Sequence, residues 1–391
     1  MKKICSVAFA TYAGMVTTVN AQSSVTLYGI VDNGINYLSN VGGHRSYAMG
    51  GGVGSRFGFQ GVEDLGDGNK AILLLENGFD PNSGKLGQGG LLFGRQAYFG
   101  LSSPYGKVTL GRQYDVKMDF VGPFEFGSQW AGSLAAHPGD LDSMNRSFRA
   151  NNSIKFDSVS YDGLSFGVQY GLGGVAGDVS RNQTFSLGAG YANGPLTLGV
   201  GYLNVRNANV SFFGNGTSGT PQATVANNSS PVFSGFLSAH TYQVVSAGGA
   251  YRLGKATLGT TYSNISFRGL GDLSSGPNPI HYSGNVSFNN AELNIQYQLI
   301  PTLIVGAEYD YTKAGKVSML AGRGGGATYQ VVAAGLDYLL SKRTDAYVLA
   351  EYQKASGTNS LNLPAVAAIN TETASGSDRQ TLIHLGIRHK F

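Results

Sequence analysis

Apolar and polar residues alternate with a period of two along almost the whole chain, and this pattern restricts the fold more than any other feature. A period of two places neighbouring side chains on opposite faces of a β-strand, so each such segment predicts a strand with one apolar and one polar face. The same split occurs at residues 164–171, 196–202, 303–311 and 383–387. The clearest segment has Ala291, Leu293, Ile295, Tyr297 and Leu299 on one parity, with Asn290, Glu292, Asn294, Gln296 and Gln298 on the other.

Strand-like segments of this kind are separated by connections that alternate between short and long. Short turns on one rim and long loops on the other are typical of an outer-membrane barrel. The long connections, rich in Gly, Ser and Asn, are 115–148, 207–239, 269–283, 314–326 and 355–378. The sixteen predicted strands are 24–38, 52–63, 68–80, 91–102, 105–114, 149–161, 163–172, 182–193, 195–206, 240–253, 254–268, 284–299, 301–313, 327–340, 342–354 and 379–391.

Strands can cross a bilayer only if the sheet closes on itself, because hydrocarbon offers no partner for backbone N–H and C=O groups. The apolar parity then faces lipid and the polar parity faces a water-filled lumen. Sixteen strands about 4.8 Å apart and tilted by about 45° give a diameter of roughly 35 Å, too wide for side chains alone to fill. The predicted fold class is therefore all-β, a 16-stranded antiparallel transmembrane β-barrel.

Composition leaves few alternatives to this barrel. Charged residues make up only 13% of the chain, and glycine accounts for 59 of its 391 residues. After residue 20 no apolar run reaches the length of about 18 residues that a transmembrane helix needs. A soluble β-sandwich or β-solenoid would also alternate, but the sequence has neither the interdomain linker that a sandwich of this length needs nor the fixed repeat of a solenoid.

The first 21 residues have the pattern of an export signal. Lys2 and Lys3 precede an apolar stretch over residues 4–16, and residues 19–21 (Val-Asn-Ala) form a cleavage site of small residues. We therefore expect residues 1–21 to be a signal peptide and 22–391 the barrel. The only cysteine, Cys5, falls in this signal, so thiol chemistry and disulfides are not expected in the mature chain. Removing two lysines changes the formal charge from +4 to +2, which gives no indication of a nucleic-acid partner.

Five stretches of the chain resemble the Gram-negative general porins of the beta-proteobacterial type. They are 25–29 (Val-Thr-Leu-Tyr-Gly), 55–61, 94–101, 110–114 (Leu-Gly-Arg-Gln-Tyr) and 388–391 (Arg-His-Lys-Phe). Their order and spacing match the family pattern from residue 24 to the C-terminus. The resemblance implies a homotrimer of 16-stranded barrels in the outer membrane, with the third extracellular loop, here 115–148, folded into each pore.

The resemblance also implies a pore constriction. In the family, wall arginines face acids on the folded loop and set up a transverse field. The matching arginines are Arg56, Arg95, Arg112 and Arg149, and the matching acid is Glu125, which lies in Pro-Phe-Glu-Phe-Gly where the family has Pro-Glu-Phe-Gly.

Side-chain parity supports two of these arginines independently. Arg56 and Arg149 share the polar parity of their segments, whereas alternation alone would turn Arg95 and Arg112 outward. A β-bulge, or burial beneath the folded loop, would bring the latter two inside. Further acids on the loop are Asp115, Asp119, Asp140 and Asp142.

Other charged residues fall on the parity predicted to face the lumen. Charged side chains in a membrane-spanning barrel face the lumen because contact with lipid is costly. These residues are Asp32, Lys155, Glu292, Glu308, Asp310, Asp345 and Glu351. With acids and bases both present, the density of the arginine cluster favours weak anion selectivity.

The chain ends on an aromatic residue in a segment with alternating parity. Ile383, Leu385, Ile387 and Phe391 share the outward face. This ending resembles the C-terminal signature that barrel-assembly machinery recognises, with Phe391 as the assembly signal.

A passive channel for small hydrophilic solutes and ions is the function that these features favour. The alternative of the same fold is a solute-specific channel, and a third class is a non-conducting barrel enzyme or adhesin. The six histidines have no metal-ligand spacing, and Gly171-Leu172-Gly173-Gly174 follows a strand without opening a helix. Neither a metal, a cofactor nor an enzymatic activity is therefore expected.

Overall fold

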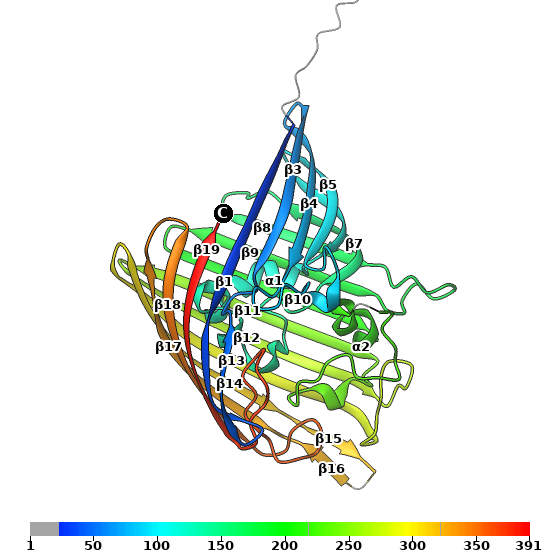
Figure 1. The fold of residues 1–391 in the computed structure, drawn as a ribbon. Coiled ribbons are helices and arrows are strands. Elements are labelled where there is room, and N and C mark those ends of the chain that lie inside the picture. Colours follow the sequence, from blue (N-terminus) through cyan, green and yellow to red (C-terminus); the bar gives the residue numbers. More distant parts are fainter. Residues whose placement is uncertain (1–22, 218, 321) are drawn as a thin grey trace, which may run out of the picture.

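The protein is a closed antiparallel β-barrel, described by a computed structural model over residues 23–217, 219–320 and 322–391 (Figure 1). The predicted signal peptide, residues 1–21, lies outside the described residues. Each strand of the ring pairs with its neighbour in sequence, and β19 pairs with β1 to close it. The sixteen strands of the ring are β1 (Ser24–Val41), β3 (Arg56–Gly66), β4 (Asn69–Gly78), β5 (Gln96–Ser103), β6 (Gly106–Gln113), β7 (Ala150–Ser158), β8 (Leu164–Gly171), β9 (Thr184–Asn193), β10 (Leu196–Arg206), β11 (Thr241–Leu253), β12 (Ala256–Leu270), β13 (Tyr282–Ile300), β14 (Leu303–Ala314), β17 (Thr328–Leu339), β18 (Thr344–Ser356) and β19 (Arg379–Lys390).

Three further strands extend this ring without enlarging it. β2 (His44–Gly50) pairs with the second half of β1, and β3 pairs with the first half, so β2 and β3 together form one strand interrupted at residues 51–55. β15 (Lys316–Met319) and β16 (Gly322–Gly325) form a hairpin in the connection between β14 and β17 (Figure 1). The predicted ring of sixteen strands is confirmed, and these short additions were not predicted.

The two faces of the wall differ as the alternation predicts. On β13, Leu293 is 66% exposed on the outer face, whereas Asn290 and Glu292 are buried on the inner face. The exposed apolar side chains form a continuous band on the outer surface. Such a band is expected of a barrel wall whose outer face contacts lipid.

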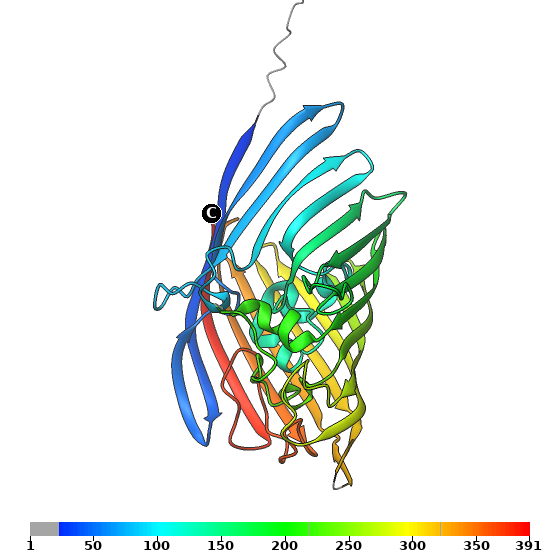
Figure 2. The ribbon, with the colours of Figure 1, turned by 90° about the vertical axis from the view of Figure 1, so that its right-hand side faces the viewer.

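The interior is largely filled by loops, not open water. Residues 114–149 pass inside the ring and contain α1 (Val116–Val121), η2 (Gly122–Phe124), η3 (Gly127–Ala131), η4 (Ser133–Ala135) and η5 (Pro138–Asp140). We call residues 115–148 the inner loop. α1 begins after Asp115, whose carboxylate accepts a hydrogen bond from the Met118 N–H at 3.0 Å. Figure 2 shows these segments enclosed by the strands.

Glycines on the inner face of the wall make room for α1. A Cβ on Gly199 would lie 2.1 Å from the carbonyl oxygen of Phe120, and one on Gly201 would lie 2.6 Å from Cγ of Lys117. Backbone and helix approach this closely only where no side chain stands between them. The inward parity is therefore rich in glycine because the inner loop packs against it.

A second filled region lies nearer the other end of the lumen. The connection between β10 and β11 contains α2 (Ala208–Ser211), η6 (Phe213–Gly216) and η7 (Ser234–Phe236). A separate short helix, η1 (Gln88–Gly90), lies in the connection between β4 and β5. Phe212, Phe233 and Phe236 pack with Phe267 and Phe288 of the wall in one buried cluster. This aromatic core closes part of the cross-section and leaves the arginine side of the barrel less obstructed.

Candidate pore constriction

Three of the four predicted arginines gather around two residues that sequence reasoning missed. Arg95 and Arg149 each donate a hydrogen bond to the Tyr114 hydroxyl at 2.9 Å. Arg95 Nε also lies 2.8 Å from Glu76 Oε1, and Arg56 Nε lies 3.6 Å from Glu76 Oε2. Glu76 and Tyr114 therefore hold the cluster. Glu76 has the inward parity of its strand, and Tyr114 ends one of the family-like motifs, so both had a sequence signal.

The remaining arginine, Arg112, does not join this cluster and is not among the residues that line the cavity beside it, which corrects its predicted place in the constriction. In the β6–β7 pair, Gly111 to Gln113 oppose Ser153 to Ala150, so the extra residue of the bulge lies on β7. Arg112 therefore keeps the parity of Val108 and Leu110, whose side chains are exposed on the outer face. Its Nε donates to the Gly94 carbonyl at 2.9 Å, and Nη1 donates to Asn151 Oδ1 at 2.5 Å. Arg95 precedes the first residue of β5, so the alternation of that strand does not govern it.

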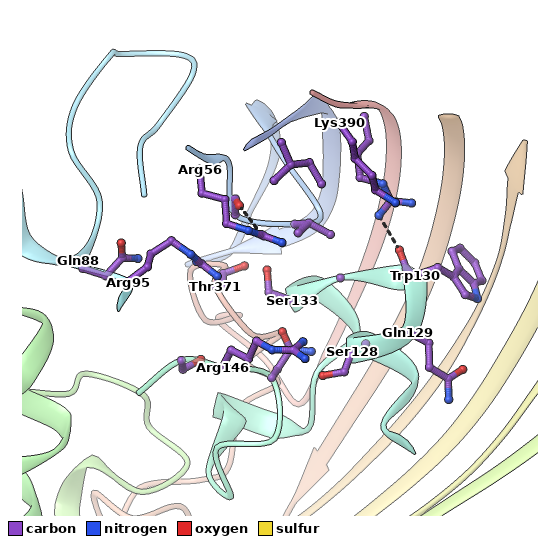
Figure 3. Close-up of a pocket in the computed structure, with 18 of the residues that line it drawn as sticks. Arg56, Gln88, Arg95, Ser128, Gln129, Trp130, Ser133, Arg146, Thr371 and Lys390 are labelled. Atoms are coloured by element: carbon purple, nitrogen blue, oxygen red, sulfur yellow. Dashed lines mark hydrogen bonds between the residues drawn. The ribbon is translucent and has the colours of Figure 1, made fainter. Parts of the chain in front are cut away.

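A cavity of about 410 Å³ opens beside this cluster (Figure 3). Hydroxyl groups of Ser128, Ser133 and Thr371 also face it. The described residues that line it include no Asp or Glu. The cavity is thus polar and surrounded by positive charge. Its basic residues are Arg56, Arg95, Arg146, Arg149, Arg388 and Lys390.

Three of these basic residues, Arg146, Arg388 and Lys390, were not predicted as site residues, and they lie on the inner loop and on β19. Arg146 belongs to the inner loop, so positive charge stands on the loop side as well as the wall side of the cavity. Arg388 of β19 is paired with Asp337 and Asp345, at 3.1 and 2.9 Å. Within the described parts of the chain, Arg146 has no ion pair.

Glu125 does not face the arginines, which corrects the predicted acidic side of the constriction. Its side chain is fully buried within the inner loop, where Ser128 Oγ and Asn145 Nδ2 donate to Oε2, both at 3.0 Å. Burial raises the pKa of Glu125 to about 8, and the charge of His137 opposes that shift. The physical reason is that the loop turns this acid toward its own backbone, where it accepts the His137 N–H at 3.2 Å.

The other acidic residues of the inner loop also form hydrogen bonds or ion pairs within the protein. Asp115 caps α1, and Asp119 pairs with Lys155 of β7. Asp140 accepts backbone N–H groups at 3.0 and 3.1 Å, and Asp142 contacts His137 at 2.8 Å. These carboxylates hold the loop together and none of them lines the arginine cavity. A transverse field between opposed charges is therefore not the arrangement at this cavity.

The residues predicted to face a water-filled lumen do point inward, but the loops cover them. Asp32 accepts hydrogen bonds from the Tyr347 hydroxyl at 2.8 Å and from the Val53 N–H at 2.8 Å. These side chains are shielded from solvent because the inner loop and the long connections between strands pack on the inner face of the wall. Asp32, Lys155, Glu292, Glu308, Asp310, Asp345 and Glu351 are all buried.

The C-terminal residue closes the barrel. Phe391 and Gly29 exchange backbone hydrogen bonds at 3.0 and 3.1 Å. A Cβ on Gly29 would lie 2.3 Å from Cζ of Phe391, so the aromatic ring lies directly over this glycine. Ile387 and Phe391 are exposed on the outer face, as the alternation predicts.

The described residues hold no cluster of three or more His, Cys, Asp or Glu side chains arranged to bind a metal ion. No helix among them is both long and apolar enough to span a bilayer. The site is thus a wall of fixed charges and hydrogen-bonding groups around a water-accessible space.

A closed 16-stranded ring with an apolar outer band and a charged inner cavity defines the class of outer-membrane channels. The family model for Gram-negative porins matches residues 6–358. An outer membrane porin protein of Bordetella pertussis is 30% identical over 100% of both chains, and Outer membrane porin protein 32 of Delftia acidovorans is 27% identical over 95% of both. The anion-selective porin from Comamonas acidovorans has a similar fold, with a TM-score of 0.69 at 22% identity over 95% of this chain and 100% of that one.

The chain belongs to the Gram-negative porin family. It is an outer-membrane protein that forms a channel for passive diffusion of small hydrophilic solutes.

Proposed function

We propose that the arginine cavity is the selective part of the conducting path and that it passes small hydrophilic anions in preference to cations. The observation that carries this proposal is the lining itself, with six basic side chains and no described carboxylate. Rings of Arg and Lys favour anions because their charge replaces part of the ion's hydration energy. The related porin whose name describes anion selectivity supports the same conclusion.

Glu76 moderates this selectivity. It neutralises part of the charge of Arg56 and Arg95, and Asp337 and Asp345 do the same for Arg388. Arg146, Arg149 and Lys390 have no such partner among the described residues, so their charges act on a passing ion without compensation. The selectivity is therefore set mainly by the residues that lack an acid beside them.

The test is single-channel current in a planar bilayer across a KCl gradient. We expect discrete open steps and a reversal potential whose sign shows preferential chloride passage. A reversal potential of the opposite sign would reject anion preference, and the absence of conducting steps would reject an open path through this cavity.

A solute-specific channel is the second candidate, and one feature favours it. A neighbouring cavity of about 570 Å³ shares Ser147 and Thr371 with the arginine cavity. Half of its lining residues carry hydroxyl or amide side chains, among them Asn228, Ser230 and Asn370, and Glu372 adds a carboxyl group. Such a lining would bind a hydroxylated solute ahead of the arginines. Saturable block of chloride current by one solute would support this function, whereas block by none would leave the general anion channel.

We propose further that the working unit is a homotrimer and that the protein is not an enzyme. The connection between β4 and β5 extends beyond the wall in Figure 2, and it exposes Leu86 and Leu92, which are suited to contact with a second barrel. Native mass spectrometry of detergent-extracted protein would give three chains per particle. Absence of peptide or lipid turnover in the same preparation would support the purely conducting role.

Phe391 is proposed to be the assembly signal and residues 1–21 the cleaved export signal. Removal of Phe391 would reduce the amount of protein assembled in the outer membrane. N-terminal sequencing of the membrane form would begin at Gln22.

A further inference from the structure

His137 lies at the point where the inner loop meets the far wall of the barrel. It is 1% exposed, and its two ring nitrogens contact carboxylates on opposite sides. Nδ1 lies 2.8 Å from Asp142 of the same loop, and Nε2 lies 2.9 Å from Glu292 of β13. One side chain thus connects the loop to itself and to the wall.

A charged imidazole is the form that fits this geometry. A neutral ring donates from only one nitrogen, whereas the protonated ring donates from both, and ionised carboxylates can only accept. The negative charges of Asp142 and Glu292 therefore favour the imidazolium. Burial alone lowers the pKa of His137, but the charge of Asp142 and the hydrogen bonds that the ring donates to both carboxylates raise it well above its usual value.

The surroundings contain many more acids than bases. Among the residues that the structure describes, a second cation near His137 is Lys117 of α1, whose ammonium donates to the backbone carbonyls of Asp142 and Ser143. Neutral groups complete the shell, with Ser263 of β12 donating to Asp142 at 2.6 Å. Without His137, the buried carboxyl groups would have only Lys117 as an opposite charge among their described neighbours. These groups are Glu125, Asp140 and Asp142 on the loop, Glu292 on β13, Glu308 and Asp310 on β14, and Glu351 on β18.

The same wall residue receives a second part of the loop. Glu292 Oε1 accepts the Phe126 N–H at 2.9 Å, two residues before Ser128 and within three of Gln129, both of which line the arginine cavity. A change at the His137–Glu292 contact is therefore transmitted directly to one side of that cavity.

We infer that His137 is the positioning residue of the pore, an ionic clamp that holds the inner loop against β13 and so fixes the width of the arginine cavity. This inference rests on the proposal that the cavity lies on the conducting path. Within the described ranges, His137 is the one side chain that contacts both Asp142 and Glu292, so replacing it separates the loop from the wall and moves residues 128–133.

The experiment measures loop release by a method that does not depend on conduction. Ala135 of the inner loop is buried in a cluster with wall residues and has no polar side chain, so Ala135→Cys in a Cys5→Ser background places one thiol where only a displaced loop exposes it. We expect His137→Ala to raise the labelling rate of this thiol by roughly tenfold or more, because it leaves buried charges unpaired. Open-channel noise in planar bilayers should rise in parallel.

A matched control and a rescue separate the clamp from mere packing. His240 forms a similar pair with Asp272 at 3.0 Å but lies on the surface, so His240→Ala should change neither readout. Adding Glu292→Gln and Asp142→Asn to His137→Ala removes the orphaned charges and should return the labelling rate toward that of the parent. A purely steric role predicts no such recovery.

An unchanged labelling rate in His137→Ala would overturn the clamp, as would failure of the charge-removing pair to restore it. If His137→Ala does not fold, Glu292→Gln alone should raise labelling several-fold, and no change there would likewise overturn it. Silent wild-type channels with loop release in His137→Ala would refute the proposed function while leaving the clamp intact.

Discussion

Replacing Arg146 with glutamine removes one uncompensated charge from the arginine cavity and disturbs little else. Arg146 has no carboxylate partner among the described residues, so no buried acid is orphaned. Its φ of 65° strains arginine and glutamine alike, so the backbone cost does not change. The substitution therefore reports on charge.

The size of the effect follows from the size of the cavity. A volume of about 410 Å³ corresponds to a sphere about 5 Å in radius, which places an ion at its centre about 6 Å from a guanidinium on the wall, the separation that enters Coulomb's law. At the dielectric constant of water one charge contributes about 0.7 kcal/mol, which screening at 0.1 M salt reduces to about 0.4 kcal/mol. Anion and cation shift in opposite directions, so the chloride-to-potassium permeability ratio should fall about fourfold.

The assay is the reversal potential of single channels across a KCl gradient, compared with that of Arg181→Gln. Arg181 is an exposed arginine of the connection between β8 and β9 and does not line the cavity, so its replacement should leave the ratio unchanged. Equal ratios for wild type and Arg146→Gln would refute the role of uncompensated loop charge. A similar decrease in both variants would show that the net charge of the protein, not the cavity, sets selectivity.

Three further outcomes follow from contacts described above. Glu76→Gln leaves buried Arg95 without its carboxylate partner. Urea titration should show a loss of about 3–5 kcal/mol in the free energy of unfolding. A loss below about 1 kcal/mol would mean that solvent reaches the Arg95–Glu76 pair. Gly201→Val would place side-chain atoms against Lys117, displacing α1 and altering unit conductance, while unchanged conductance would show that the helix adapts. Because the pKa of His137 is raised, the contribution of its charge to loop docking is complete below about pH 6.5 and is lost as the pH rises through the raised pKa. Channel noise should therefore increase only at alkaline pH. An increase on mild acidification would contradict a raised pKa of His137.

The sequence predicted the wall well because every wall residue obeys one local rule. Side chains such as Leu293 and Glu292 go outward or inward according to parity, and lipid on one side enforces that rule without exception for whole strands. Strand bounds were therefore close to those observed. Arg112 has the outward parity that alternation assigns to it and does not reach the cavity, so there the family motif misled and parity did not. The extra residue of the β7 bulge was not predicted, because alternation alone gives no indication of where a strand bulges.

The interior was harder to predict because loop contacts are not periodic. Glu125 was identified by its motif, but its orientation depends on Ser128 and Asn145, which belong to the fold of the loop alone. Arg146 lies in the same loop and carried no parity signal. The positive charge that the inner loop adds to the cavity therefore follows from the fold of the loop, not from the sequence pattern. The wall arginines, in contrast, were identified from the family motifs and, for Arg56 and Arg149, from parity.

The interruption of the wall between β2 and β3 has a mechanical consequence. Its free carbonyl at Gly52 accepts both the N–H and the hydroxyl of Ser133, at 2.6 and 3.0 Å, while the other end of the same loop is attached to β13 through His137. The inner loop therefore spans the cross-section as a brace fixed to separate parts of the ring. A cylinder braced in this way resists flattening, so lateral pressure in the bilayer should change the conductance of this channel far less than it would change that of an empty barrel of equal strand number.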